Sequence, residues 1–182
     1  MILKIDLDNV KPYDAGFKEL ASIFHSAHPY LDSFLKEDWA LDPSFGKTYV
    51  WLTEENSAII GYYNITTGYI EQDNWGILER MGGAIHINCF SLDERYRGIL
   101  VGNRDDGAPI RLSDLLLQEC IHRIESIREK YVGFAFITLC ATDMGYHLYQ
   151  RQGFFDLEED MSFHTNEKDI ENIFMYYPLE YE

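Results

Sequence analysis

The feature that most constrains the fold is a strand–helix–strand passage in the second half of the chain. Ala84–Leu92 reads as a strand, and Ser113–Lys130 reads as a helix with one apolar stripe and a polar opposite face. Phe134–Cys140 is a continuous apolar run, which is typical of a strand buried on both faces. The passage predicts a sheet that contains one helical crossover, so a sheet made only of hairpins is excluded.

The remaining elements alternate without an internal repeat or a linker, so we expect one domain over residues 1–182 with a mixed α+β fold. Two stretches rich in glycine, proline and polar residues read as loops, namely Tyr69–Gly82 and Arg95–Arg111. The helices that we expect are Tyr13–Ala27, Leu31–Lys36 and Met144–Gln152, and the further strands are Met1–Leu7, Thr48–Thr53, Ala58–Thr67, Asp160–Phe163 and Ile173–Leu179.

Composition narrows the class of protein. The chain has 46% hydrophobic and 25% charged residues, which is close to the average of soluble globular proteins. Its formal net charge of -16 creates an averaged field that repels nucleic acid and anionic lipid surfaces. We therefore expect a cationic or neutral partner, and neither nucleic acid nor a membrane.

The sequence offers no metal site and no targeting segment. Cys89, Cys120 and Cys140 are an odd number without metal-type spacing, and we interpret them as reduced, mostly buried thiols. His25 and His28 have no ligand partners at metal spacing, so we interpret them as surface or packing residues. The acidic start and the absence of an apolar run of about 20 residues favour a cytoplasmic protein.

Four segments of the second half resemble the GNAT superfamily of N-acetyltransferases. The resemblance extends over roughly residues 48–179 when the hairpin around Gly61 is included. It implies a central mixed, mostly antiparallel sheet of about seven strands flanked by helices. The segments that carry it are Ile87–Gly98, Leu112–Cys120, Phe136–Thr142 and Leu148–Phe154.

The resemblance also implies acetyl-CoA as co-substrate. In this family the strand similar to Ala84–Leu92 separates from its neighbour and pairs with the pantetheine arm, which places Phe90, Ser91 and Leu92 along the cofactor. Thr142 stands where the family often has an asparagine that contacts the cofactor. The following helix receives the pyrophosphate at its N-terminus, where free amides and the helix dipole favour anions.

The phosphate-binding loop departs from the family pattern, and two alignments compete. In the first, the loop is Arg97–Gly102, which includes Gly98; Arg97 and Gly102 match the pattern, and Leu100 stands in place of the central glycine. The second treats Asn103–Pro109 as an insertion and brings Arg111, Leu112 and Ser113 to the phosphates. We favour the second because Ser113 fits the start of the helix. Asp114 then adds negative charge beside the phosphates, which predicts weak cofactor binding.

Two residues are candidates for proton transfer. Tyr149 stands where the family commonly places a tyrosine that protonates the leaving thiolate of CoA, although a tyrosine there also packs against the sheet. His86 is the one imidazole on the strand Ala84–Leu92 and could accept a proton from an attacking amine. A core or rim histidine is the alternative interpretation of His86.

These residues predict a transferase that moves an acetyl group from acetyl-CoA to a primary amine by direct attack, since no serine or cysteine has an activating base beside it. We expect a small-molecule or peptide amine as acceptor, and the oligomeric state, including a homodimer, stays open. One alternative is an interaction protein that keeps the fold without catalysis. The other is a toxin that acetylates aminoacyl-tRNA, which the net charge of -16 disfavours.

Overall fold

The computed structural model describes residues 6–163 and 172–180. The chain divides into two compact units: unit 1 comprises Met1–Asn64 with Cys89–Cys120, and unit 2 comprises Ile65–Asn88 with Ile121–Glu182. Three elements contribute residues to both units, namely β3 (Ile59–Asn74), β4 (Ile77–Leu92) and α3 (Leu112–Lys130). The single domain expected over residues 1–182 stays a prediction.

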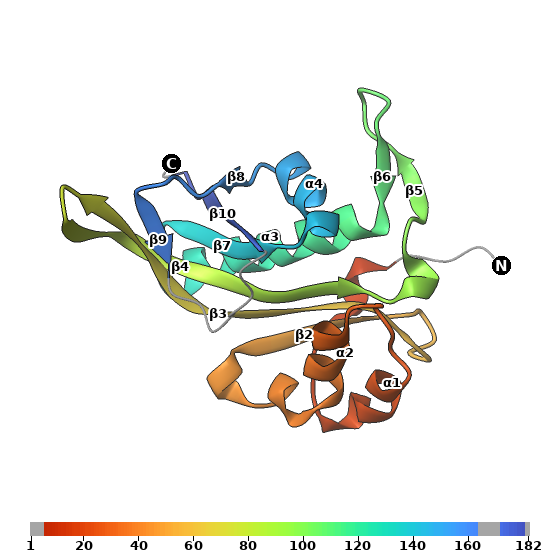
Figure 1. The fold of residues 1–182 in the computed structure, drawn as a ribbon. Coiled ribbons are helices and arrows are strands. Elements are labelled where there is room, and N and C mark those ends of the chain that lie inside the picture. Colours follow the sequence, from red (N-terminus) through yellow and green to blue (C-terminus); the bar gives the residue numbers. More distant parts are fainter. Residues whose placement is uncertain (1–5, 164–171, 181–182) are drawn as a thin grey trace. The chain divides into compact units, whose positions relative to one another are not determined.

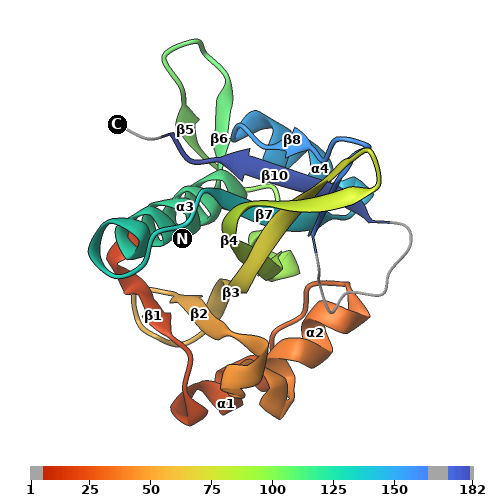
Figure 2. The same ribbon diagram turned by 90° about the vertical axis from the view of Figure 1, so that its left-hand side faces the viewer.

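Unit 1 contains the strand order β1-β2-β3-β4 and a separate hairpin of β5 and β6. Helices α1 and α2 lie together beside β2 in both ribbon views (Figures 1 and 2). Asp6, Asp14, Asp42 and Asp93 each begin a short 3-10 turn by accepting a backbone N–H. The bounds are β1 (Val10–Pro12), α1 (Lys18–Ser22), α2 (Pro29–Lys36), β2 (Lys47–Leu52), β5 (Leu100–Asn103) and β6 (Pro109–Arg111), with 3-10 turns at Leu7–Asn9, Ala15–Phe17, Asp38–Ala40, Pro43–Phe45 and Glu94–Tyr96.

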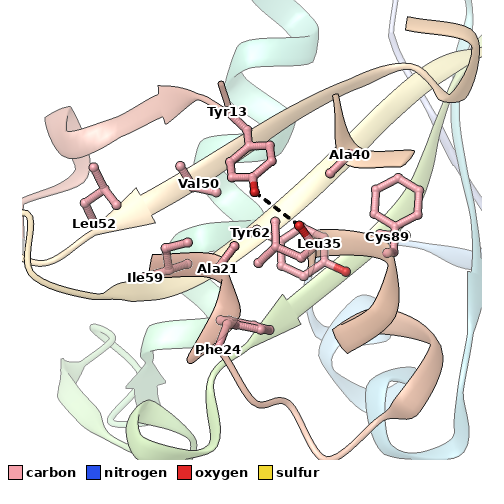
Figure 3. Close-up of a cluster of buried hydrophobic side chains, with 11 residues drawn as sticks. Tyr13, Ala21, Phe24, Leu35, Ala40, Val50, Leu52, Ile59, Tyr62 and Cys89 are labelled. Carbon is pink, nitrogen blue, oxygen red and sulfur yellow. Dashed lines mark hydrogen bonds between the residues drawn. The ribbon is translucent and has the colours of Figure 1, made fainter. Parts of the chain in front are cut away.

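Successive residues of β3 point to opposite faces of the sheet in unit 1. The ring of Tyr62 stacks on Phe34 at 6.4 Å and meets Phe24 edge-on at 5.5 Å, so this face packs against α1 and α2 (Figure 3). On the other face, the Tyr63 hydroxyl donates to Glu119 Oε2 of α3 at 2.6 Å. The first turns of α3 and the pair α1–α2 therefore cover opposite faces of the same strand.

Gly61 permits this close packing. A Cβ atom at this position would lie 2.7 Å from the Ser91 carbonyl oxygen, 2.6 Å from Leu92 Cδ2 and 2.8 Å from Leu116 Cδ2. Only a residue without a side chain lets α3 and the end of β4 approach β3 this closely. The neighbouring positions are fully buried, with Tyr62 and Tyr63 both at 0% exposure.

In unit 2 the strands follow the order β3-β4-β7-β10-β8, and β9 pairs with β3. Strands β4 and β7 are parallel, whereas β10 is antiparallel to both β7 and β8. The parallel pair is the crossover predicted from the sequence, and the mixed, mostly antiparallel sheet with its helices confirms the predicted α+β fold class. The bounds are β7 (Phe136–Ala141), α4 (Asp143–Arg151), β8 (Phe155–Asp156), β9 (Met161–Phe163) and β10 (Ile173–Pro178).

Two segments predicted as loops are strands, and those predictions were wrong. Within Tyr69–Gly82, β3 continues to Asn74 and β4 starts at Ile77. The two strands are joined by Trp75 and Gly76, both at positive φ (56° and 86°), which is the geometry of a two-residue hairpin turn. Within Arg95–Arg111, β5 and β6 form the second hairpin, in which Gly107 has a φ of 83°.

The N-terminal predictions fail in detail. Residues 1–5 of the predicted strand Met1–Leu7 lie outside the described residues, and the first described strand begins at Val10. The helix predicted over Tyr13–Ala27 is shorter, because α1 ends at Ser22 and Ala27 has a φ of 61°. By contrast, the ends predicted for α3 and α4 agree with the structure to within one residue.

Three further findings concern the described residues only. None of their helices combines the length and apolar character that crossing a bilayer requires. No group of three or more His, Cys, Asp or Glu residues among them is arranged to hold a metal ion. Cys89, Cys120 and Cys140 are free thiols, and the first two are buried.

Candidate functional site

The connection from β4 to α3 in unit 1 carries the predicted phosphate-binding residues. The β5–β6 hairpin is closed at its base, where Leu100 pairs with Arg111 and the Leu112 N–H donates to the Ile99 carbonyl at 3.2 Å. Residues 100–111 are therefore an inserted hairpin, larger than the predicted insertion Asn103–Pro109. The closure brings Gly98 and Ile99 next to Leu112 in space, so residues from both competing alignments meet at the start of α3.

A buried carboxylate occupies the N-terminus of α3. The Arg111 N–H donates to Asp114 Oδ2 at 2.8 Å, and Asp114 is 0% exposed. This is the return contact of a capping box, in which an acidic residue in the first turn reaches back to the residue before the helix. The Arg111 and Leu112 amides thus already donate within the protein. Because α3 begins at Leu112, Ser113 lies inside the first turn, and the prediction that it caps the helix was wrong. The Asp114 carboxyl group lies where the resemblance places the pyrophosphate.

Arg97 and Gly98 lie on the segment that leads to this helix. The Arg97 guanidinium donates to the Ser26 carbonyl oxygen, and its side chain is otherwise exposed. Gly98 has a φ of 76°, which favours glycine, and a Cβ atom added there would have no heavy atom within 4 Å.

An ion-pair network that we did not predict holds this segment. Arg95 contacts Asp93 twice, with Nε to Oδ1 and Nη2 to Oδ2 both at 2.8 Å. Burial alone would raise the pKa of Asp93, but the hydrogen bonds from Arg95 and from the His25 N–H lower it below its usual value. His25 Nδ1 also contacts Asp32 Oδ2 at 2.7 Å. His25 is exposed and also makes these contacts, which agrees with its interpretation as a surface or packing residue.

The residues predicted to lie along the cofactor on β4 differ in exposure. Ser91 and Leu92 are buried, at 6% and 7% exposure, and both contact the space beside Gly61. This position favours a packing role for the Leu92 side chain. Phe90 is half-buried.

In unit 2 the backbone pairing between β4 and β7 is short. It runs from Ala84 opposite Phe136 to Ile87 opposite Leu139, whereas β7 continues to Ala141. The pairing of these two strands therefore ends two residues before β7 does. The resemblance implies that β4 separates from its neighbour. Pairing of β4 with β7 up to Ala141 would have contradicted that expectation.

Thr142 and Tyr149 both belong to the α4 region of unit 2. Thr142 is the N-cap of α4, and its hydroxyl accepts the Gly145 N–H at 3.3 Å. Tyr149 is 7% exposed, and its ring meets Phe154 edge-on at 5.9 Å. A Cβ atom at Gly145, one turn earlier in α4, would lie 3.0 Å from Tyr149 Cε2. The ring therefore packs against both Gly145 and Phe154.

His86 is buried in unit 2, with 3% exposure. Its Nδ1 lies 3.0 Å from Thr138 Oγ1, and its ring packs 5.3 Å from Phe163. Burial lowers the pKa of His86 to about 4, so the imidazole is neutral at physiological pH and is a weak base. These properties are those of a core histidine.

Comparison with known proteins defines the fold. No protein-family model and no curated protein matches the chain. Solved structures do match it, at sequence identities that show the fold alone. Together with the mixed sheet and its parallel β4–β7 pair, they show that the chain has the GNAT fold.

The matching structures include bacterial toxins and complexes. AtaTR bound with AcCoA has 13% identity and a TM-score of 0.68, covering 93% of this chain and 92% of that chain. AtaT complexed with acetyl-methionyl-tRNAfMet has 15% identity and a TM-score of 0.59, covering 98% and 92%. The KacTA–DNA complex has 16% identity and a TM-score of 0.63, covering 93% and 91%.

These complexes correct our prediction about partners. We expected a small-molecule or peptide amine and argued against nucleic acid from the net charge of -16. Proteins with the same fold occur in complexes with DNA and with tRNA, so that prediction was wrong. The physical reason is that net charge describes an averaged field, whereas phosphate contacts depend on the charges within about a Debye length, roughly 8 Å.

Proposed function

We propose that this protein is an acetyl-CoA-dependent N-acetyltransferase of the toxin type, whose acceptor is the amino group of an aminoacyl-tRNA. The observation that carries the proposal is the match to AtaT over 98% of the chain, in a structure that contains acetyl-methionyl-tRNAfMet. The match to AtaTR bound with AcCoA supports acetyl-CoA as the donor. The proposed reaction needs no metal ion.

The chemistry is direct acyl transfer. The neutral amine attacks the thioester carbonyl carbon, a C–N bond forms, and the C–S bond breaks as the thiolate leaves. Tyr149 donates its phenolic proton to that thiolate, and the proton released by the amine passes to solvent. The buried, weakly basic His86 is not needed for either transfer. We assign the backbone of β4 beyond Ile87 to the pantetheine arm, because its pairing with β7 ends there.

At the phosphate end, we assign the start of α3 with Arg97, Gly98 and Arg111 to the pyrophosphate. Asp114 opposes this binding through its charge. Replacing Asp114 with Asn keeps an oxygen that accepts the Arg111 N–H and removes the charge. We expect Asp114→Asn to bind acetyl-CoA several-fold more tightly, since a charge at a helix N-terminus contributes about 0.3–1 kcal/mol or more.

Arginines that could contact tRNA phosphates are present despite the acidic chain. They are Arg97, Arg104 and Arg111, whereas the Arg95 guanidinium is already held by Asp93. Contacts with phosphates through these arginines would make tRNA binding fall steeply as salt concentration rises.

The test measures transfer of labelled acetyl groups from acetyl-CoA to a pool of aminoacyl-tRNA, with uncharged tRNA as the control. We expect label only in the aminoacylated pool. Tyr149→Phe should lower kcat by about a hundredfold and leave the Kd for acetyl-CoA unchanged. Tyr146→Phe is the matched control, because Tyr146 lies on the same helix and its hydroxyl contacts Asp156 at 3.0 Å; it should keep its activity.

A second candidate function follows from Asp114. If its charge prevents cofactor binding, the chain is an interaction protein that keeps the fold without catalysis. Calorimetry distinguishes the two: acetyl-CoA binding by the wild type supports the enzyme, whereas binding by Asp114→Asn but not by the wild type supports the interaction protein. Transfer to uncharged tRNA or free amino acids alone would refute the proposed acceptor.

A further inference from the structure

The tip of the β3–β4 hairpin in unit 2 exposes large apolar side chains. We define the hairpin tip as Asp73–Met81, in which every residue is exposed. Trp75 is 97% exposed, Ile77 65%, Leu78 63% and Met81 38%. Figure 1 shows the hairpin extending past β9 as a two-stranded ribbon. An apolar cluster that contributes this little to a core indicates a binding surface.

The backbone of β4 in this region is an edge. Among the described residues, the strands that pair with β4 are β3 and β7, and the pairing with β7 starts at Ala84. Residues Ile77–Gly82 of β4 therefore have a strand on one side only. The other strand of the hairpin is covered, because Ile70 to Gln72 of β3 pair with β9. Unpaired N–H and C=O groups on an edge strand are a template for a further strand.

The charges around this edge are mostly negative. The tip carries Asp73 and Glu79 with one base, Arg80, whose guanidinium lies over the Tyr69 ring at 5.0 Å. The turn before β9 carries further acids on the β3 side of the hairpin, opposite the open β4 edge, and there the Asp73 N–H donates to the Asp160 carbonyl at 2.7 Å. The acids of this turn are Glu158, Glu159 and Asp160.

We propose that the β4 edge at Ile77–Gly82 binds, by strand addition, an extended segment of a partner protein in which basic and apolar residues alternate. The backbone of the segment would pair with the edge. Because successive strand residues point to opposite faces, its apolar side chains would cover Leu78 on one face and its basic side chains would meet Glu79 on the other. This surface is separate from the residues assigned to acetyl transfer, so the inference does not depend on the proposed activity.

Charge selects this occupant over the alternatives. A second copy of the chain would bring the same acidic tip and a net charge of -16, which repel. Nucleic acid and anionic lipid would be repelled by the same acids. A segment with both basic and apolar residues can cover the exposed apolar side chains, and its positive charges are attracted by the acids.

The test uses a fluorescein-labelled ten-residue peptide of alternating lysine and valine, titrated with the full chain and followed by fluorescence anisotropy. We expect binding that falls at least tenfold in Trp75→Ser/Leu78→Ser. The matched control is Tyr131→Ser/Val132→Ser, which removes two other exposed apolar side chains of unit 2, 81% and 54% exposed, and should bind normally. Hydrogen exchange of the amides at 77–82 should slow when the peptide is bound.

Two further probes can overturn the inference. The same peptide with alternate N-methylated amides cannot pair along one side, so equal binding of this peptide would refute strand addition. A glutamate–valine peptide that binds as tightly as the lysine–valine peptide would refute the role of charge. Equal affinity in the tip variant and the wild type would refute the location, and a dimer that dissociates in the tip variant would assign the surface to a second copy.

Discussion

Two regions of the same long hairpin contain large apolar side chains and use them in opposite ways. In Ile59–Ile65 of β3 every residue is buried, whereas in the hairpin tip, Asp73–Met81, every residue is exposed. The first region packs between helices on both faces, through Tyr62 on one side and Gly61 on the other. The difference teaches that apolar content alone does not show which residues stabilise the fold. The following predictions test this contrast on stability.

The largest expected effect comes from glycines on the same strand. Gly61→Ala places a Cβ 2.7 Å from the Ser91 carbonyl oxygen, a backbone atom that can move away only if the paired strand shifts. We expect a loss of about 3 kcal/mol in the free energy of unfolding, measured by urea denaturation. Gly68→Ala is the matched control, because the nearest atom to its Cβ would be His86 Cβ at 4.0 Å. Equal losses in both variants would show that strand propensity, not packing, sets the cost.

The second prediction concerns acid stability. His86 is buried in β4, and its pKa in the folded protein is about 4, below the ordinary value of 6.5. The unfolded chain therefore binds a proton first as pH falls, so stability present above pH 6.5 is lost as pH falls towards 4. The loss should reach roughly 2 kcal/mol by about pH 5.

His86→Gln should flatten this part of the stability profile, measured by urea denaturation at a series of pH values. Gln retains a group that can hydrogen-bond to Thr138 but does not titrate. A variant that loses stability with the same slope as the wild type would show that other groups cause the acid sensitivity.

The third prediction concerns the hydroxyl of Tyr62, which donates to the Leu31 carbonyl at 2.7 Å. Tyr62→Phe leaves that carbonyl oxygen without this donor inside the core, so we expect a loss of about 1–2 kcal/mol. Thermal unfolding followed by calorimetry measures it. Tyr131→Phe, at a residue 81% exposed, is the control and should change stability little. If Tyr62→Phe leaves the free energy of unfolding unchanged, the ring stabilises the fold by its packing alone and the hydroxyl contributes nothing.

The sequence predicted the long periodic elements well, for physical reasons. The apolar stripe of α3 repeats along the whole helix, and Phe136–Ala141 is buried on both faces, so local pattern and tertiary environment agree. The outer part of the β3–β4 hairpin was misread because Glu71–Asn74 are polar and resemble a loop. Glu71 and Gln72 pair with β9, and the strand forms one arm of the hairpin with β4; no local pattern shows either pairing.

The candidate site was predicted in part. The positions of Thr142 and Tyr149 on α4 follow from a short helix closed by Gly153, which the sequence shows directly. The meeting of Gly98 with Leu112 could not be predicted, because it depends on the Leu112 N–H bonding to Ile99 across an inserted hairpin. Local reasoning places residues on elements, whereas long-range hydrogen bonds decide which of them meet.

The smallest expected effect on stability is at the hairpin tip, where it separates the exposed apolar side chains most clearly from the buried ones of Ile59–Ile65. Trp75 is 97% exposed, so Trp75→Ser removes almost no buried area, and we expect the free energy of unfolding to change by less than about 0.5 kcal/mol. Urea denaturation measures this. A loss of about 2 kcal/mol or more would mean that Trp75 packs in the folded protein, and would contradict both the exposure of the tip and its role as a binding surface. A neutral Trp75→Ser that weakens binding of the lysine–valine peptide would show that this side chain serves binding and not folding.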